Sequence, residues 1–283
     1  MIKRIDGVPA KYSYAFPHHN RPRSADFYGV TEILYCLRRA FLQRVVPGPT
    51  AMEFSKRALM SRGHAMEAAF FGDTHNPEYF VGDGNLEGLE GHSDHVVRDA
   101  AGKIDEIVEF KSVRRLWYKA PNGKSYYSIT MAKKAIDKAD WSKIEHRYND
   151  SHLDQLMLYM YITGAPNGVL IYQEMSTDKL YTWTITSDDI SDEFKKRIED
   201  RLGILRSCID NQTIPDKLFS YDFECGLCNY NKNGVCTLCD QDGFDLKEMC
   251  DVLNSGDVEK TFDGVVNKYL DKYGVKAGME GNK

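Results

Sequence analysis

An acidic residue and a lysine stand two positions apart in the segment Ile-Val-Glu-Phe-Lys at 107–111. Side chains alternate along a β-strand, so Glu109 and Lys111 would share one face, with Val108 and Phe110 on the other. A carboxylate can hold a divalent cation, and an ammonium group can orient an attacking water or neutralise charge on a phosphorane. The pair suits phosphodiester hydrolysis, but the same pattern is also typical of a solvated strand face with a surface ion pair.

Two more carboxylates precede this pair. Asp94 follows Gly91 and lies fifteen residues before Glu109, a separation that a β-hairpin can close so that both carboxylates reach one ion. Glu67 lies one helical turn after Gly63, a residue that permits close backbone approach, and would complete the metal shell. The alternatives are a turn residue for Asp94 and an exposed helical residue for Glu67.

A polar pair occurs further along the chain, in a segment with helical periodicity. Gln155 and Tyr159 are four residues apart and therefore share one face of a helix. Both side chains can hydrogen-bond a phosphate or an attacking water. A buried tyrosine and a helix-capping glutamine are equally good interpretations of the pair.

The cysteines form a second group with chemical potential. Four of the seven cysteines make two C-x-x-C steps, Cys225 with Cys228 and Cys236 with Cys239. Such spacing is typical of metal-binding thiolates in a reducing compartment and unlike a secreted disulfide scaffold. By spacing alone, structural zinc is favoured.

Charge is distributed unevenly along the 283 residues. The net charge is -5 at pH 7, yet residues 111–147 hold ten Lys and Arg against three Asp and Glu. This excess predicts a basic patch, with a solvated charged face as the alternative. Side chains available for base stacking or phosphate contacts, with a core role for the aromatic ones as the alternative, are Trp117, Tyr118, Tyr126, Tyr127, Arg38, Arg39 and Arg44.

Periodicity indicates the elements that must position these residues. Residues 116–127 are expected to form an exposed loop, and the pattern as a whole predicts an α/β or α+β core. No apolar run long enough to span a membrane and no signal peptide is found, so a cytoplasmic protein is expected. Helices are predicted at 31–45, 51–71, 151–163 and 188–209 and in the tail around 262–269, and strands at 86–89, 94–98, 104–113, 168–173 and 180–186.

Taken in order, the motifs G-x-x-x-E, G-x-x-D, E-x-K and Q-x-x-x-Y resemble those of RecB-type nucleases of the PD-(D/E)XK superfamily. With the cysteines, the chain is most similar to the CRISPR-associated RecB-like exonuclease family, over about residues 28–240. The resemblance implies a restriction-endonuclease-like core, a mixed central sheet flanked by helices. One departure is Glu67, where many members have histidine, which keeps a ligand but makes the metal shell harder and more anionic.

The resemblance also implies cofactors and roles. Mg²⁺ or Mn²⁺ would be held by Glu67, Asp94, Glu109 and Phe110, with Lys111 assisting. Gln155 and Tyr159 would position the phosphate or water. An iron-sulfur cluster of four irons and four sulfurs would join the early cysteine, Cys36, to three cysteines near the C-terminus. These three are taken as Cys225, Cys228 and Cys236, with Cys239 as the alternative to Cys236. Cys208 and Cys250 lie outside the pattern.

These interpretations give four segments: an N-terminal extension (1–27), a nuclease core (28–215), a cysteine-rich loop (216–240) and a helical tail (241–283). The function implied by the resemblance is an exonuclease acting on single-stranded DNA ends, as in prespacer processing beside the Cas integrase complex. One alternative is a recombination or repair nuclease of a virus or mobile element. Another is a non-catalytic DNA-binding module with a structural zinc or iron-sulfur site.

Overall fold

A computed structural model describes residues 27–46, 54–127, 129–134, 142–147, 149–218, 228–255 and 261–276. The predicted N-terminal extension, apart from its last residue, and Cys225 lie outside these ranges. None of the described helices is both long enough and apolar enough to cross a membrane.

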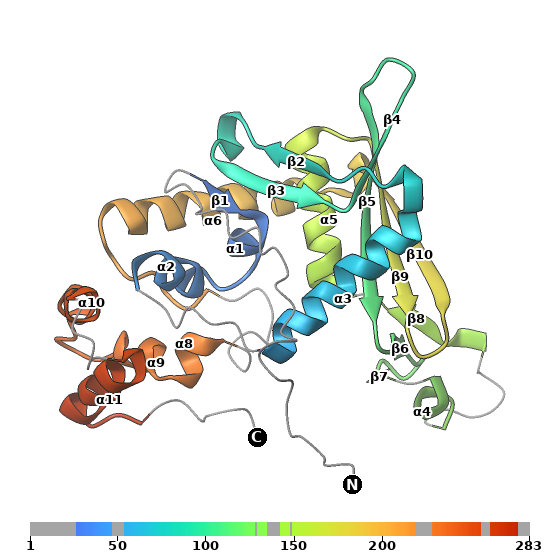
Figure 1. The fold of residues 1–283 in the computed structure, drawn as a ribbon. Coiled ribbons are helices and arrows are strands. Elements are labelled where there is room, and N and C mark those ends of the chain that lie inside the picture. Colours follow the sequence, from blue (N-terminus) through green and yellow to red (C-terminus); the bar gives the residue numbers. More distant parts are fainter. Residues whose placement is uncertain are drawn as a thin grey trace, which may run out of the picture.

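A four-stranded mixed sheet forms the centre of the molecule, in the order β10-β9-β5-β4 (Figure 1). Strands β5 and β9 run parallel, and the pairs β4-β5 and β9-β10 are antiparallel. The strands are β4 (His95–Arg98), β5 (Ile104–Val113), β9 (Asn167–Glu174) and β10 (Lys179–Thr186). The predicted mixed α/β core and its strands 104–113, 168–173 and 180–186 are therefore confirmed.

Helices pack on both faces of this sheet. Helix α5 (Asp150–Thr163) is the crossover between the parallel strands β5 and β9, as such strands require, and it packs against both. Its N-terminus is capped by the Asn149 side chain. Helix α3 (Phe54–Phe71) packs against β5 from the other side, where Phe70 stacks on Phe110.

A second sheet has the order β1-β3-β2 and joins the first through a single residue. Its strands are β1 (Tyr28–Gly29), β2 (Glu78–Val81) and β3 (Leu89–Ser93). The predicted strand at 86–89 was wrong in placement, because Gly84–Leu86 forms a 3₁₀ turn and pairing begins at Leu89. The chain leaves β3 at Asp94 and enters β4 of the central sheet directly afterwards.

The predicted loop at 116–127 was wrong, because two of its segments form strands of a third sheet in the order β7-β6-β8. Its strands are β6 (Trp117–Lys119), β7 (Ser125–Tyr126) and β8 (Glu145–Arg147), and the short helix α4 (Ile129–Lys134) contacts β6 and β7. Tyr118, at the centre of β6, is buried. A loop was expected from the richness in aromatic, Gly, Asn and Lys residues, but β6 pairs both with the nearby β7 and with β8, which lies more than twenty residues away.

The single helix predicted at 31–45 was also wrong, because the chain forms α1 (Val30–Leu34) and α2 (Leu37–Val45) with a break at Tyr35 and Cys36. Arg201 on α6 (Asp192–Asp210) donates hydrogen bonds to the carbonyl oxygens of Ile33 and Tyr35. These carbonyls are thereby drawn out of the helical ladder, and Cys36 becomes the residue that begins α2.

The C-terminal part is helical. It contains α8 (Asn229–Lys232), α9 (Val235–Leu238), α10 (Leu246–Asn254) and α11 (Phe262–Tyr273). Helix α11 packs against α9 and α10, and these helices lie beside α2 rather than beside the central sheet (Figure 1).

Candidate active site

Strand β5 places Glu109 and Lys111 on the face covered by α5. Lys111 donates a hydrogen bond to Glu109 Oε1 through its Nζ. Glu109 is completely buried, so the alternative of a solvated strand face is excluded for this pair. Among the described residues none donates a hydrogen bond to Glu109 Oε2, which leaves a buried acceptor oxygen unpaired.

Asp94 lies beside this pair because β4 and β5 form the hairpin that the spacing predicted. His95 is opposite Val108 in the register, so Asp94 falls next to Glu109. One carboxylate oxygen of Asp94, Oδ2, accepts the Phe110 backbone N–H at 2.7 Å and lies 3.9 Å from Lys111 Nζ. The lysine therefore sits between two carboxylates and partly compensates both.

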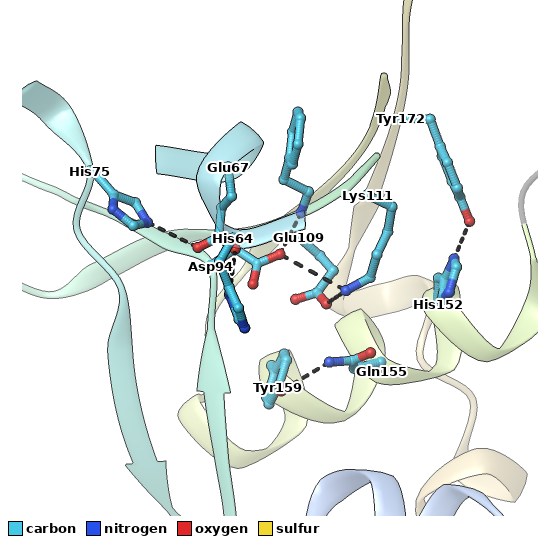
Figure 2. Close-up of polar contacts among 11 residues, drawn as sticks. His64, Glu67, His75, Asp94, Glu109, Lys111, His152, Gln155, Tyr159 and Tyr172 are labelled. Atoms are coloured by element: carbon cyan, nitrogen blue, oxygen red, sulfur yellow. Dashed lines mark hydrogen bonds and ion pairs between the residues drawn. The ribbon is translucent and has the colours of Figure 1, made fainter. Parts of the chain in front are cut away.

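Glu67 reaches the same region from the last turns of α3, as Figure 2 shows. Its carboxylate lies 3.0 Å from His75 Nε2 and 3.6 Å from His64 Nδ1. The expected role of Gly63 in close packing is wrong, since a Cβ there would meet nothing nearer than Ser112 Oγ at 4.0 Å. Glu67 thus points toward the other carboxylates with histidines behind it.

Burial and mutual repulsion change the acidity of these groups. Burial raises the pKa of Glu109 to about 8, Asp94 and Glu67 add to the increase, and Lys111 opposes it. Burial also raises the pKa of Glu67, and the charge of Asp94 adds to it. For Lys111, burial disfavours the charged form, but Glu109 and Asp94 outweigh it and raise the pKa. The three carboxylates therefore share a site in which negative charge is costly.

Helix α5 covers this site with the predicted polar pair. Gln155 Nε2 donates to Tyr159 Oη at 3.0 Å, and Tyr159 is buried. A Cβ at Gly91 would collide with the Tyr159 ring and lie 3.0 Å from Val30 Cγ2. Gly91 is therefore the glycine that allows close approach here, because it lets β3 lie directly against the tyrosine.

His152 and Tyr172 extend the site and were not assigned a role from sequence. His152 lies three residues before Gln155 on α5, and Tyr172 is the register partner of Lys111 on β9. The Tyr172 hydroxyl accepts the Asn149 backbone N–H at 3.1 Å and contacts His152 Nδ1. The signal that would have found His152 is its position three residues before Gln155, which is itself four residues before Tyr159, so that all three share one face of the helix.

The protonation of this pair follows from its partners. The Tyr172 oxygen accepts one N–H, so its own proton is free to be donated to His152 Nδ1. Burial lowers the pKa of His152 to about 3, and the charge of Lys111 acts in the same direction. His152 is thus held as a neutral imidazole, which carries its proton on Nε2 when Nδ1 accepts the Tyr172 hydroxyl.

The donor set fits a hard divalent cation, since it consists of three carboxylates and includes the unpaired Glu109 Oε2. Within the described ranges, however, no three Cys, His, Asp or Glu side chains lie close enough together to hold a metal ion as they stand. Lys111 Nζ sits against Asp94 and Glu109. Coordination would therefore need small movements of Lys111 and Glu67.

Three of the predicted cluster cysteines line one cavity at another site, although within the described ranges they do not lie close enough together to hold a metal ion as they stand. Cys36, Cys228 and Cys236 line one cavity, which also includes Arg39 and Lys217. All three cysteines are buried. The other cysteines of the described residues, Cys239, Cys208 and Cys250, do not line this cavity.

Two arginines expected to contact phosphates are engaged elsewhere. Buried Arg38 donates to the Pro215 carbonyl oxygen at 2.8 Å and pairs with Asp240. Arg44 pairs with Glu32 at 2.8 Å. Both therefore stabilise the fold around α2, and the expectation of a phosphate-binding role was wrong for them.

Comparison with known proteins gives a general likeness. No family model and no curated protein matches the chain. Among solved structures it is similar to SSO0001, with 16% identity over 73% of this chain and 85% of that chain and a TM-score of 0.41. It is similar to an alkaline exonuclease, LHK-Exo, from Laribacter hongkongensis, with 12% identity over 66% and 91% of the two chains and a TM-score of 0.40.

A phage-related exonuclease from Haemophilus somnus is similar as well, with 11% identity over 65% of this chain and 81% of that chain and a TM-score of 0.36. A likeness at this level says nothing of what the chain does. Its chemistry has to be argued from its own side chains.

Proposed function

We propose that the chain is a metal-dependent deoxyribonuclease of the PD-(D/E)XK type. The observation that carries the proposal is the buried Glu109, whose Oε2 has no partner among the described residues and whose Oε1 is bound by Lys111. Keeping a carboxylate in such a place costs stability unless it serves a ligand. A non-catalytic DNA-binding module would have no use for this arrangement, so we regard it as the weaker alternative.

In this proposal Glu67, Asp94, Glu109 and the backbone carbonyl of Phe110 hold Mg²⁺ or Mn²⁺. The bound ion supplies Lewis acidity to the phosphate and lowers the pKa of an attacking water. Asp94 is kept in orientation by the Phe110 N–H, and Glu109 is kept dry by its burial. Asp94 and Glu109 are thus oriented before an ion arrives.

Lys111 and the residues of α5 act on the substrate. The Lys111 ammonium stays charged because its carboxylate neighbours raise its pKa, so it can offset charge that develops on the phosphate. Gln155 and Tyr159 orient the phosphate or the water through their amide and hydroxyl groups. His152 Nε2–H is a further neutral donor from the same helix face.

For the cysteines we propose a four-iron, four-sulfur cluster held by Cys36, Cys228, Cys236 and Cys225. The shared cavity of the first three residues supports this set and favours Cys236 over Cys239. The cluster would link segments nearly two hundred residues apart in sequence and stabilise the fold rather than take part in cleavage. The alternative is structural zinc at the same thiols.

The biological setting is proposed from the sequence resemblance alone. It is the processing of single-stranded DNA ends for CRISPR adaptation, in contact with the Cas integrase complex, with viral or mobile-element recombination as the alternative. Co-purification with a tagged integrase complex would support the first setting. Absence of binding at micromolar concentration would favour the second.

The nuclease proposal is tested with a labelled single-stranded DNA and purified protein. Cleavage is expected with Mg²⁺ or Mn²⁺ and is expected to fall steeply with Ca²⁺, whose larger and looser coordination shell activates water poorly. Equal rates in Mg²⁺ and Ca²⁺, or cleavage unaffected by EDTA, would contradict a metal-dependent mechanism.

A further inference from the structure

The third sheet and the residue that follows β7 expose two large aromatic side chains. Trp117 is 51% exposed and Tyr127 is 47% exposed, and their rings meet edge to face with centroids 6.1 Å apart. Strand alternation puts Trp117 and Lys119 on one side of β6 and the buried Tyr118 on the other. Aromatic side chains left in water as a pair indicate a surface that binds something flat and apolar.

The surface is fastened to the central sheet by one buried carboxylate. Glu174, at the end of β9, accepts the Leu116 N–H at 3.1 Å and the Thr177 hydroxyl at 2.9 Å, and its Oε2 lies 3.5 Å from the Tyr118 hydroxyl. The His146 ring packs against the Tyr118 ring with centroids 5.1 Å apart. The exposed ring of Trp117 is therefore presented from a firmly held strand.

The same surface is basic. Arg114, Arg115, Lys119 and Lys124 are exposed and lie within three sequence positions of Trp117 or Tyr127, while Glu145 is the acidic residue among the described positions of 111–147. Exposed guanidinium and ammonium groups bind phosphates, and their contribution falls with salt. The combination of open rings and positive charge fits a polyanion that carries aromatic bases.

The surface continues from the candidate active site. β5 carries Glu109 and Lys111, ends at Val113, and leads within a few residues to Trp117. β5 and β9 run parallel, so their C-terminal ends lie at the same edge, and the small sheet is at that edge (Figure 1). A strand of nucleic acid engaged at Lys111 can therefore reach the aromatic pair.

Resting on the proposed nuclease function, we infer that Trp117 and Tyr127 form a stacking platform for unpaired bases of single-stranded DNA, with the surrounding basic residues binding its phosphates. Bases in a duplex are already stacked on one another and leave no ring face for the tryptophan. The platform thus selects single strands next to the reaction site. Tyr118, which is buried, takes no part.

The test measures binding of fluorescein-labelled oligothymidylate by anisotropy in EDTA, where no cleavage takes place. Trp117→Ala is expected to weaken binding roughly ten- to hundred-fold, the usual effect of losing one stacked base. Trp117→Phe should recover much of it, because a ring is kept. Tyr79→Ala is the matched control, since Tyr79 is an aromatic residue of the second sheet that is 39% exposed.

A blunt-ended duplex of two annealed strands, which has no unpaired base, is the second ligand. The affinity for this duplex is expected to be lower and to change little in Trp117→Ala. Lys119→Ala should lower the affinity for both DNAs and make binding less dependent on salt. Wild-type affinity of Trp117→Ala for oligothymidylate, or equal losses for both DNAs, would overturn the platform. A thermal melt of each variant in EDTA shows whether the variant is folded. If Trp117→Ala is unfolded, the affinity of Trp117→Phe for the two DNAs is the deciding measurement.

The two proposals fail in different ways. If the wild-type protein cleaves DNA and Glu109→Gln does not, while Trp117→Ala binds normally, the platform is wrong and the nuclease assignment remains. If no divalent ion supports cleavage but binding still depends on Trp117, the nuclease assignment is wrong and the platform remains.

Discussion

The candidate active site and the cysteine cavity are built in opposite ways. Glu109 and Lys111 are fixed by the register of long paired strands, so their geometry follows from the sheet itself. The cavity is lined by residues of α2, α8 and α9, and the last two helices have only four residues each. Helices so short are not stable on their own. The sheet therefore holds its site without a ligand, whereas the cysteine region depends on tertiary contacts and on what its thiols bind.

The largest expected effect is a loss of cleavage activity without a loss of folding, at the carboxylate site on the central sheet. Glu109→Gln should lower cleavage by about a thousand-fold, since it removes a charged ligand from the reaction centre while keeping its shape. Initial rates on labelled single-stranded DNA with Mg²⁺ measure the loss, and circular dichroism checks the fold. Glu106→Gln, on the same strand, is the control; cleavage by Glu109→Gln at the control's rate would contradict the proposed site.

At the cysteine cavity the opposite pattern is expected. Cys36→Ser or Cys228→Ser should reduce iron content and visible absorption near 400 nm and lower the melting temperature by several degrees, since the cluster stabilises the folded chain. Anaerobic purification with iron analysis measures both. Cys208→Ser should change neither property.

The fourth thiol sharpens the same comparison. Cys236→Ser should lose the colour and Cys239→Ser should keep it, because only Cys236 lines the cavity with Cys36 and Cys228. A colourless wild-type protein with one equivalent of zinc would replace the cluster by a zinc site. It would leave the carboxylate site untouched.

A smaller effect is expected at the edge of the sheet site. His152→Ala should reduce kcat about ten-fold with little change in KM, because it removes a donor that acts at the reacting phosphate rather than in general binding. Tyr172→Phe should have a weaker effect, since the imidazole of His152 remains and only the hydroxyl that contacts its Nδ1 is lost. Tyr161→Phe serves as the control, because Tyr161 lies elsewhere on α5 and donates its hydroxyl to Glu199 of α6; an equal loss there would indicate a general effect on the helix.

The smallest effect concerns the stability of the metal-free protein. Burial raises the pKa of Glu109 from the ordinary 4.5 of a glutamate carboxyl to about 8, so the folded state holds the proton more tightly than the unfolded state. Stability should therefore fall as pH rises from 6.5 to 8, while Lys111, with its raised pKa, contributes a constant amount over that range. Urea unfolding in EDTA measures this slope.

Glu109→Gln should flatten the slope. The depressed pKa of His152 affects both proteins alike and cancels in the comparison, because its contribution is lost only as pH falls below about 6.5. At pH 8, Mg²⁺ should increase the free energy of unfolding of the wild type more than that of the variant. An identical slope in the two proteins would show that Glu109 does not titrate as its burial requires.

Local periodicity was enough to predict the parts of the site that lie on regular elements. Alternation placed Glu109 with Lys111, hairpin spacing placed Asp94 beside them, and helical spacing joined Gln155 to Tyr159. Each prediction needs only one strand, one hairpin or one helix. The roles of these residues remain predictions for the experiments above.

The errors come from contacts between distant segments. The break before Cys36 is made by Arg201, which lies more than 160 residues later, and no local pattern indicates it. The third sheet depends on Glu174, which binds the Leu116 N–H from β9. In both cases a buried polar side chain overrides the local propensity, and only the tertiary structure reveals its target.

The contact between Gly91 and Tyr159 has a consequence for how the sequence can evolve. Any side chain at position 91 would collide with the ring, so the two positions cannot drift independently. Gly91→Ala alone should be severely damaging, and Tyr159→Leu should make it tolerable by opening room on β3. Among related chains the pair should therefore covary, with a residue larger than glycine at position 91 occurring only where position 159 has lost its ring.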